Sequence, residues 1–240
     1  LNFSRDMERE ADRVGFGVMS DAGFEPQGFA SMFDKLQAAS RLNDNGAFPY
    51  LRSHPLTSER IADIRGRLPL GVTGDAVPPM KLDHAMIRAR SRVLSNYMTI
   101  DALRAMVTQA QAPRRDELPV PAQVEILYAA ALASAQMRDF SAATSWARKL
   151  AEPVKDDPAA RRLASLLDIE LALMSGQSAP EIAPSGRAEL LLMAQVWLRD
   201  GQAAKAASAL QTWTVAHPRD ATAWQMLGRA NLAQGQVLRG

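Results

Sequence analysis

The residues with the clearest chemical potential lie near the amino terminus, where two carboxylates are four positions apart. Glu8 and Asp12 belong to the segment EREAD, and this spacing puts both side chains on one face of a helix. Such a pair could supply one metal ligand and one acceptor that orients a ligating histidine. The alternative is a solvated acidic first turn that stabilises the helix dipole, and the spacing alone favours that alternative.

Histidine is scarce, with three residues in a chain of 240, and cysteine is absent. A metal ion could therefore take only histidine and carboxylate ligands. His217 directly precedes a proline and His84 begins a predicted helix, so structural or surface roles suit both. His54 differs because it lies in a Ser-His-Pro-Leu-Thr segment of a long predicted loop, and long loops in compact domains are often functional. An isolated loop histidine is nevertheless more often a bystander than a ligand.

The segment that carries the carboxylates predicts a helix with an apolar stripe. We expect the stripe to consist of Val14, Val18 and Met19, and Gly23 to end the helix. A second helix is predicted after Pro26, because aromatic and aliphatic residues recur there at helical spacing.

A third helix is predicted to begin near Thr57 or Ser58 and to present Ile61 and Ile64 on one face. Residues 40–55, between the second and third helices, are rich in Asn, Asp, Gly and Pro. This composition predicts a long surface loop, which carries His54.

A stretch rich in proline and glycine divides the chain. Residues 69–83 are predicted to be a linker between a first domain, 1–68, and a second domain, 84–240. From there onward Ala, Leu, Gln and Arg dominate, with breaks at short regular intervals. The second domain is therefore predicted to be helical throughout, and the fold class to be all-α.

An internal repeat supports this prediction. Four residues near the carboxyl end are each matched 34 positions later: Leu190 by Trp224, Ala194 by Gly228, Leu198 by Leu232, and Gly201 by Gly235. A period of 34 residues is that of the tetratricopeptide repeat. Residues 124–152 resemble another copy, and residues 159–176 are interpreted as a degenerate helix pair. The alternative is a generic Ala-rich bundle with coincidental spacing.

Composition excludes several classes of protein. The formal net charge of +2 is too small to argue for nucleic acid, and the basic segment 87–92 is interpreted as a solvated helix face. A membrane-spanning helix would need a run of about 18 apolar residues, and the sequence contains no such run. The lack of cysteine suits reducing and oxidising compartments alike. Because the chain opens at Leu1 rather than Met, we expect it to be part of a longer protein.

The segment SRDMEREADRVG, residues 4–15, resembles the E-x-x-A-D helix of the zinc metallopeptidases related to HtpX and the prenyl-protein (CAAX) proteases. The resemblance extends through Gly23-Phe24-x-Pro26 and a Phe-x-x-Leu helix to the segment SHPLTSERIAD, residues 53–63. With tetratricopeptide repeats following, this order is similar to that of the BepA-type periplasmic proteases of Gram-negative bacteria. The resemblance covers essentially the whole chain.

This resemblance implies roles for four residues. Glu8 matches the third zinc ligand, which joins two histidines of an HExxH helix, and Asp12 matches a carboxylate that orients a zinc-bound histidine. His54 matches a histidine that can take the fourth zinc position and displace the catalytic water. Arg60 matches an arginine that faces the active site and suits stabilisation of an oxyanion.

The chain departs from the family pattern in one respect, because no HExxH motif occurs in its 240 residues. Two histidine ligands and the glutamate that acts as general base are therefore missing. We expect the chain by itself to be inactive and to bind zinc weakly at best. A resting state in which His54 closes the open zinc position is a hypothesis.

The resemblance implies the C-terminal helical part of a gluzincin-type peptidase domain followed by an α-solenoid of tetratricopeptide-like repeats. The implied function is zinc-dependent endoproteolysis in envelope protein quality control, in the periplasm, with an export signal upstream of these residues. The repeats would bind protein clients or the outer-membrane protein assembly machinery, with a surface formed by Leu190, Ala194, Val196 and Trp224. Trp224 could equally be a packing residue. The alternative function is that of a non-catalytic tetratricopeptide scaffold.

Overall fold

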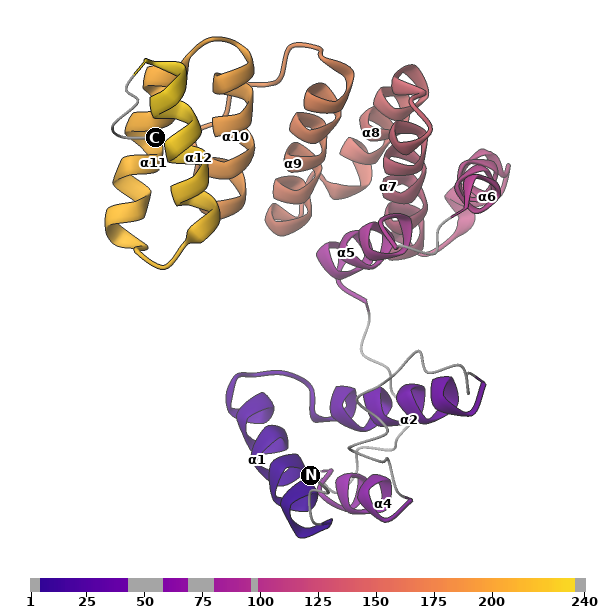
Figure 1. The fold of residues 1–240 in the computed structure, drawn as a ribbon. Coiled ribbons are helices and arrows are strands. Elements are labelled where there is room, and N and C mark those ends of the chain that lie inside the picture. The colour runs from indigo at the N-terminus through magenta and orange to yellow at the C-terminus, as the bar shows by residue number, and fades with distance from the viewer. Residues whose placement is uncertain (1–4, 43–57, 69–79, 96–98, 236–240) are drawn as a thin grey trace. The chain divides into compact units, whose positions relative to one another are not determined.

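The computed structural model describes residues 5–42, 58–68, 80–95 and 99–235 (Figure 1). These residues form helices and connecting turns with no strand among them, so the predicted all-α class is confirmed. The chain divides into two compact units, Leu1–Pro79 and Met80–Gly240. Within the described ranges, no helix has the length and apolar character that crossing a membrane requires.

The first unit contains α1 (Arg5–Asp21), α2 (Pro26–Leu42) and α4 (Ser58–Gly66). Among the residues that the structure describes, its apolar core consists of Phe29, Ala30, Phe33, Ile61 and Ile64. The predicted third helix and its inward-facing isoleucines are confirmed, with Ile64 completely buried. Gly23 ends the first helix in the left-handed conformation, at a φ of 78°, as predicted.

The apolar stripe predicted for α1 is wrong for its two valines, whereas Met19 packs against the apolar core of the unit. Val14 and Val18 are 49% and 63% exposed, whereas Glu8 and Asp12 are only 8% and 6% exposed. The helix thus turns its carboxylates toward α4 and its valines toward solvent. The physical reason is a counter-charge on α4, since a carboxylate can be buried when it is paired and hydrogen-bonded.

The second unit contains eight α-helices in the part of the chain that the structure describes, together with one short 3₁₀ turn at Arg115–Glu117. The helices are α5 (Leu82–Val93), α6 (Ile100–Gln111), α7 (Val120–Gln136), α8 (Phe140–Val154), α9 (Pro158–Ser175), α10 (Arg187–Arg199), α11 (Ala203–Ala216) and α12 (Ala221–Ala233). Helix α5 begins at Leu82, inside the predicted linker 69–83, and residues 69–79 of that linker lie outside the described residues.

Two apolar clusters hold the second unit together. One cluster is formed by residues of the five helices from α5 through α9. The other is formed by residues of the carboxyl-terminal half of α9 and of α10, α11 and α12. The degenerate helix pair predicted for residues 159–176 is wrong, because α9 is a single helix. It begins at Pro158 behind the Asp157 cap and meets no further proline or glycine before Gly176, where the chain turns at a φ of 72°.

Helix α5 is fixed to its neighbours by ion pairs rather than presenting a purely solvated basic face. Arg88 and Arg92 both pair with Glu125 of α7. Arg90 pairs with Glu170 of α9 at 2.6 Å and donates to the Tyr128 hydroxyl. The basic segment 87–92 therefore links α5 to α7 and α9 through ion pairs.

Candidate functional site

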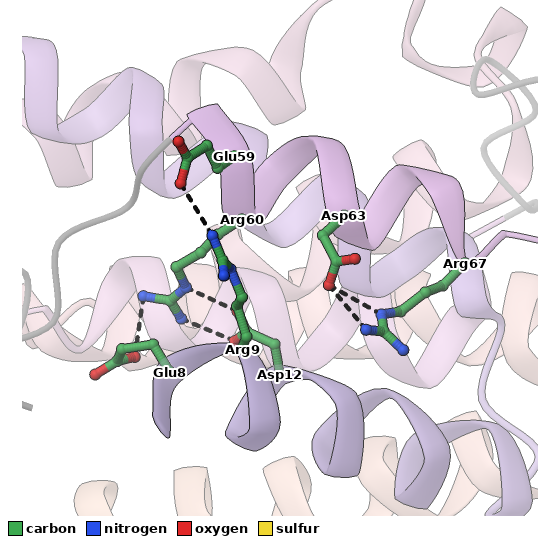
Figure 2. Close-up of polar contacts among 7 residues, drawn as sticks. All are labelled: Glu8, Arg9, Asp12, Glu59, Arg60, Asp63 and Arg67. Carbon is green, nitrogen blue, oxygen red and sulfur yellow. Dashed lines mark hydrogen bonds and ion pairs between the residues drawn. The ribbon is translucent and has the colours of Figure 1, made fainter. Parts of the chain in front are cut away.

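The carboxylate pair of α1 meets an arginine from α4 at the centre of the first unit (Figure 2). Arg60 Nε and Nη2 donate to the two Asp12 oxygens at 2.7 and 2.8 Å. Arg60 Nη1 lies 3.0 Å from Glu8 Oε2. We call these three residues the Arg60 cluster. One guanidinium thus engages two carboxylates through all three of its nitrogens.

Local structure explains why these groups meet. The spacing of four between the carboxylates stacks them on one face of α1. On α4, Arg60 directly precedes Ile61, and both side chains are buried because this side of the helix packs on the interior of the first unit. The ring of Phe33 lies 5.5 Å from the guanidinium carbon and supports it by a cation–π contact.

Two further ion pairs, which are in contact with water, lie on the same helices. Arg9 of α1 pairs with Glu59 of α4 at 3.2 Å, and Arg67, which directly follows α4, pairs with Asp63 of that helix at 2.9 Å (Figure 2). Exposed pairs of this kind each contribute little, about 0–1 kcal/mol. The attachment of α1 to α4 therefore depends on the Arg60 cluster, where charge-assisted bidentate bonds form away from water.

The cluster carries a formal charge of −1, from two carboxylates and one guanidinium. The side chains of Arg60, Glu8 and Asp12 are 8%, 10% and 7% exposed, so desolvation opposes the charged state of each. The arrangement holds the Glu8 and Asp12 carboxyl groups at fixed positions relative to one another. Such fixed acceptors suit the orientation of a neighbouring side chain.

Three of the four predicted peptidase residues come together in this cluster, and the fourth, His54, lies outside the described residues. The described part of the chain contains no group of three His, Cys, Asp or Glu side chains that could hold a metal. The Arg60 guanidinium also opposes a cation beside Glu8 and Asp12. These residues therefore do not fit a zinc ion by themselves.

The predicted protein-binding surface needs a correction. Leu190, Ala194 and Val196 are at most 4% exposed and belong to the apolar cluster of α10, α11 and α12. Side chains this deeply buried pack the repeat and cannot contact a client in this conformation. Trp224, at 49% exposed, is the one of the four that faces outward.

Sequence reasoning missed a polar cluster at the junction of α10, α11 and α12. Asp220 accepts hydrogen bonds from Arg187 Nε at 2.8 Å, Trp213 Nε1 at 2.9 Å and the Ala223 amide at 3.2 Å. The Arg187 guanidinium and the Trp213 indole hold the pKa of the Asp220 carboxyl well below its usual range. An aspartate directly before the helical segment ATAW is an N-cap signal that could have indicated this role.

Comparison with known proteins supports the resemblance that the motifs carry. Residues 1–68 match the sequence profile of Peptidase family M48. The chain is 30% identical to a putative beta-barrel assembly-enhancing protease of Vibrio cholerae, over 98% of this chain and 48% of that protein. It is 26% identical to the beta-barrel assembly-enhancing protease of Escherichia coli K12, over 97% of this chain and 47% of that protein.

A shorter similarity is confined to a part of the chain. It joins 29% of the chain, at 36% identity, to 20% of a mitochondrial metalloendopeptidase of Schizosaccharomyces pombe. The chain spans about half the length of the beta-barrel assembly-enhancing proteases that it matches. Residues 1–68 are therefore similar to peptidase family M48, and the chain as a whole is similar to part of the beta-barrel assembly-enhancing proteases.

Proposed function

We propose that this chain is part of a zinc-dependent metalloendopeptidase that acts in the quality control of outer-membrane β-barrel proteins in the periplasm. The observation that carries the proposal is the Arg60 cluster, in which two motif carboxylates and a motif arginine from distant helices are buried together. The names of the relatives support the process in which it acts.

In this proposal Glu8 ligates zinc and Asp12 orients a zinc-bound histidine. His54 is the reversible fourth ligand. Bound zinc would supply Lewis acidity and an activated water. Because the described residues do not fit zinc alone, a site that includes Glu8 needs donors from outside them.

Arg60 acts in this proposal as a positioning residue, and this revises its predicted role as an oxyanion stabiliser. Its three nitrogens are all engaged by Glu8 and Asp12, and its side chain is 8% exposed. To bind an oxyanion, the guanidinium would have to leave a buried carboxylate unpaired, which costs several kcal/mol, about 3–5. Holding the two carboxylates in register requires no such movement.

The second unit binds protein clients or components of the outer-membrane assembly machinery in this proposal. A solenoid of helices offers an extended surface for protein partners. The alternative is a non-catalytic scaffold, which the lack of an HExxH motif in the full-length protein would favour.

The test compares this chain with the full-length product of its gene. For the 240-residue chain we expect no stoichiometric zinc by mass spectrometry and no cleavage of casein. For the full-length protein we expect one zinc, with Glu8→Gln abolishing both the zinc and the cleavage. The matched control is Glu10→Gln, because Glu10 lies on the same helix in an exposed pair with Arg13. Full zinc and activity in the Glu8→Gln variant would refute the proposed site, and a metal-free, inactive full-length protein would favour the scaffold.

A further inference from the structure

The repeat that contains α9 has a first helix but no second helix. Helices α7 and α10 are each followed directly by a helix that packs on them, α8 and α11 respectively. Helix α9 is followed instead by residues 176–186, an irregular connection that contains no helix (Figure 1). The position that a second helix takes in the neighbouring repeats is therefore not filled by a helix beside α9.

One face of α9 is exposed in this repeat. In α10 the fourth, eighth and eleventh residues of the helix are at most 4% exposed: Leu190, Ala194 and Trp197. In α9 the residues at the same three positions are polar and exposed: Arg161, Ser165 and Asp168. In α7 the residues 34 positions before these three are buried: Leu127, Ala131 and Ser134. The same face is thus buried where a second helix follows and open where none does.

A hollow of about 360 Å³ lies at the point where the second helix would begin. It is lined by the amino-terminal half of α8 and by the residue that follows the turn after α9: Phe140, Ser141, Thr144, Ser145, Arg148 and Gln177. Because residues 141, 144, 145 and 148 are spaced by three and four positions, they share one polar face of α8. The hollow lies in the interior of the described range 99–235, between α8 and the connection from α9 to α10.

Charge around this position favours an acidic occupant. Arg148 and Arg161 have no ion pair among the described residues, whereas Arg162, beside Arg161, pairs with Glu189. Asp168 is the one acidic residue of the open α9 face, and partial burial raises the pKa of its carboxyl. Two arginines, which suit carboxylate partners, therefore outweigh one carboxylate whose charged state is disfavoured.

We propose that an acidic α-helix of a partner protein occupies this position and completes the repeat. We name the position the α9 slot and define it by Ser145 and Arg148 of α8 and by Arg161, Ser165 and Asp168 of α9. A helix fits because a helix takes the equivalent place beside α7 and α10. Polar and charged walls suit a helix that binds and leaves, since a permanent one would be held by apolar residues, as in those repeats. The inference rests on the proposed protein-binding role of the second unit.

The experiment uses the intact 240-residue chain and a stapled, alanine-based helical peptide that carries glutamates along one face and a fluorescein label. Fluorescence anisotropy is expected to show saturable binding that weakens as the salt concentration rises. Arg148→Glu and Arg161→Glu should each weaken binding by about fivefold or more, because each places like charge beside the glutamates. A peptide of the same composition with its glutamates spread around the helix should bind more weakly.

The matched control is Arg229→Glu on α12. Arg229 is also an exposed arginine without an ion pair among the described residues, and its replacement should leave the affinity unchanged. Circular dichroism melts establish that all three variants fold.

A second measurement locates the peptide. Because the chain contains no cysteine, Ser165→Cys introduces a single thiol into the α9 slot. This variant should form a disulfide with a peptide that bears a cysteine on its glutamate face. Ser208→Cys, at an exposed position of α11, should not.

Three outcomes would overturn the inference. These are no saturable binding, equal binding to the Arg148→Glu and Arg161→Glu variants, and binding to the 240-residue chain but not to the full-length protein. The last would assign the α9 slot to another segment of the protein itself. Failure of the proposed function is separate, because zinc content and casein cleavage are measured without the peptide.

Discussion

The two units of the chain bury charge in different ways. Among the described residues, the first has an apolar core of five buried residues, with three buried charged side chains beside it. The second has two large apolar clusters, and its buried carboxylates, Glu125 and Glu189, pair with arginines whose side chains are 47–55% exposed. In the first unit both partners of the ion pairs are buried, whereas in the second the arginines reach solvent.

This difference separates a site from a scaffold. Buried ion pairs are weak sources of stability, because desolvation offsets most of their attraction, and apolar replacements often serve stability as well or better. A small unit that nevertheless buries two carboxylates together with their arginine points to a use for them beyond packing. In the second unit the arginine partners of Glu125 and Glu189 stay in contact with water, so only one side of each ion pair is desolvated.

The largest effect is expected from removing the counter-charge of the first unit. Arg60→Ala would leave two buried carboxylates without their guanidinium and destabilise the first unit by about 4 kcal/mol. Hydrogen exchange should show loss of amide protection in α1 and α4 while α7 keeps its protection. Unchanged protection in α1 would contradict the central role of the Arg60 cluster.

The control is Arg65→Ala on the same helix. Arg65 pairs with Asp34 in an exposed position, with side chains 60% and 43% exposed, so the expected cost is below about 1 kcal/mol. A triple variant, Glu8→Leu, Asp12→Leu and Arg60→Met, should recover much of the lost stability, because apolar groups replace the whole cluster.

An intermediate effect is expected in the second unit from a core truncation. Leu210→Ala removes a completely buried side chain and should cost about 3 kcal/mol, measured by urea denaturation. Leu232→Ala is the matched control, since Leu232 is 52% exposed and its truncation should change stability by less than about 0.5 kcal/mol. A large loss from Leu232→Ala would mean that the Leu232 side chain is covered in solution.

The smallest effect is expected from acid acting on the edges of the second unit. The Arg162 guanidinium lowers the pKa of Glu189, and Arg187 with Trp213 lowers that of Asp220. Because both pKa values are lower in the folded state, their stabilisation is present above the unfolded pKa of about 4 and is lost as the pH falls below it. The melting temperature of the second unit should therefore drop between about pH 5 and pH 3, and Glu189→Gln should flatten this dependence.

Much of the fold could be predicted from periodicity. The 34-residue repeat indicated equivalent helices at α10 and α12, and the spacing of Glu8 and Asp12 correctly placed both on one helix face. Periodicity failed where a distant charge decides orientation. The hydrophobic pattern assigned Val14 and Val18 to the core, but both are exposed. A pattern of hydrophobicity within α1 takes no account of Arg60, which lies 48 residues further along the chain and pairs with Asp12.

The residues of the candidate site were predicted from the sequence, but the ion pairs between them were not. Motif resemblance named Glu8, Asp12 and Arg60, yet the ion pairs among them are tertiary contacts that no local pattern encodes. The repeat residues Leu190 and Ala194 were placed on a binding surface because the pattern does not state which copy has a neighbour. Burial distinguishes α10 from α12, and burial depends on what lies alongside each helix.

The separation of 48 residues between Asp12 and Arg60 also orders events during synthesis. As the polypeptide leaves the ribosome, α1 emerges before α4, and its two carboxylates stay hydrated until Arg60 can pair with them. Since an unpaired carboxylate is costly to bury, α1 can complete its packing on α4 only after residue 60 has been synthesised.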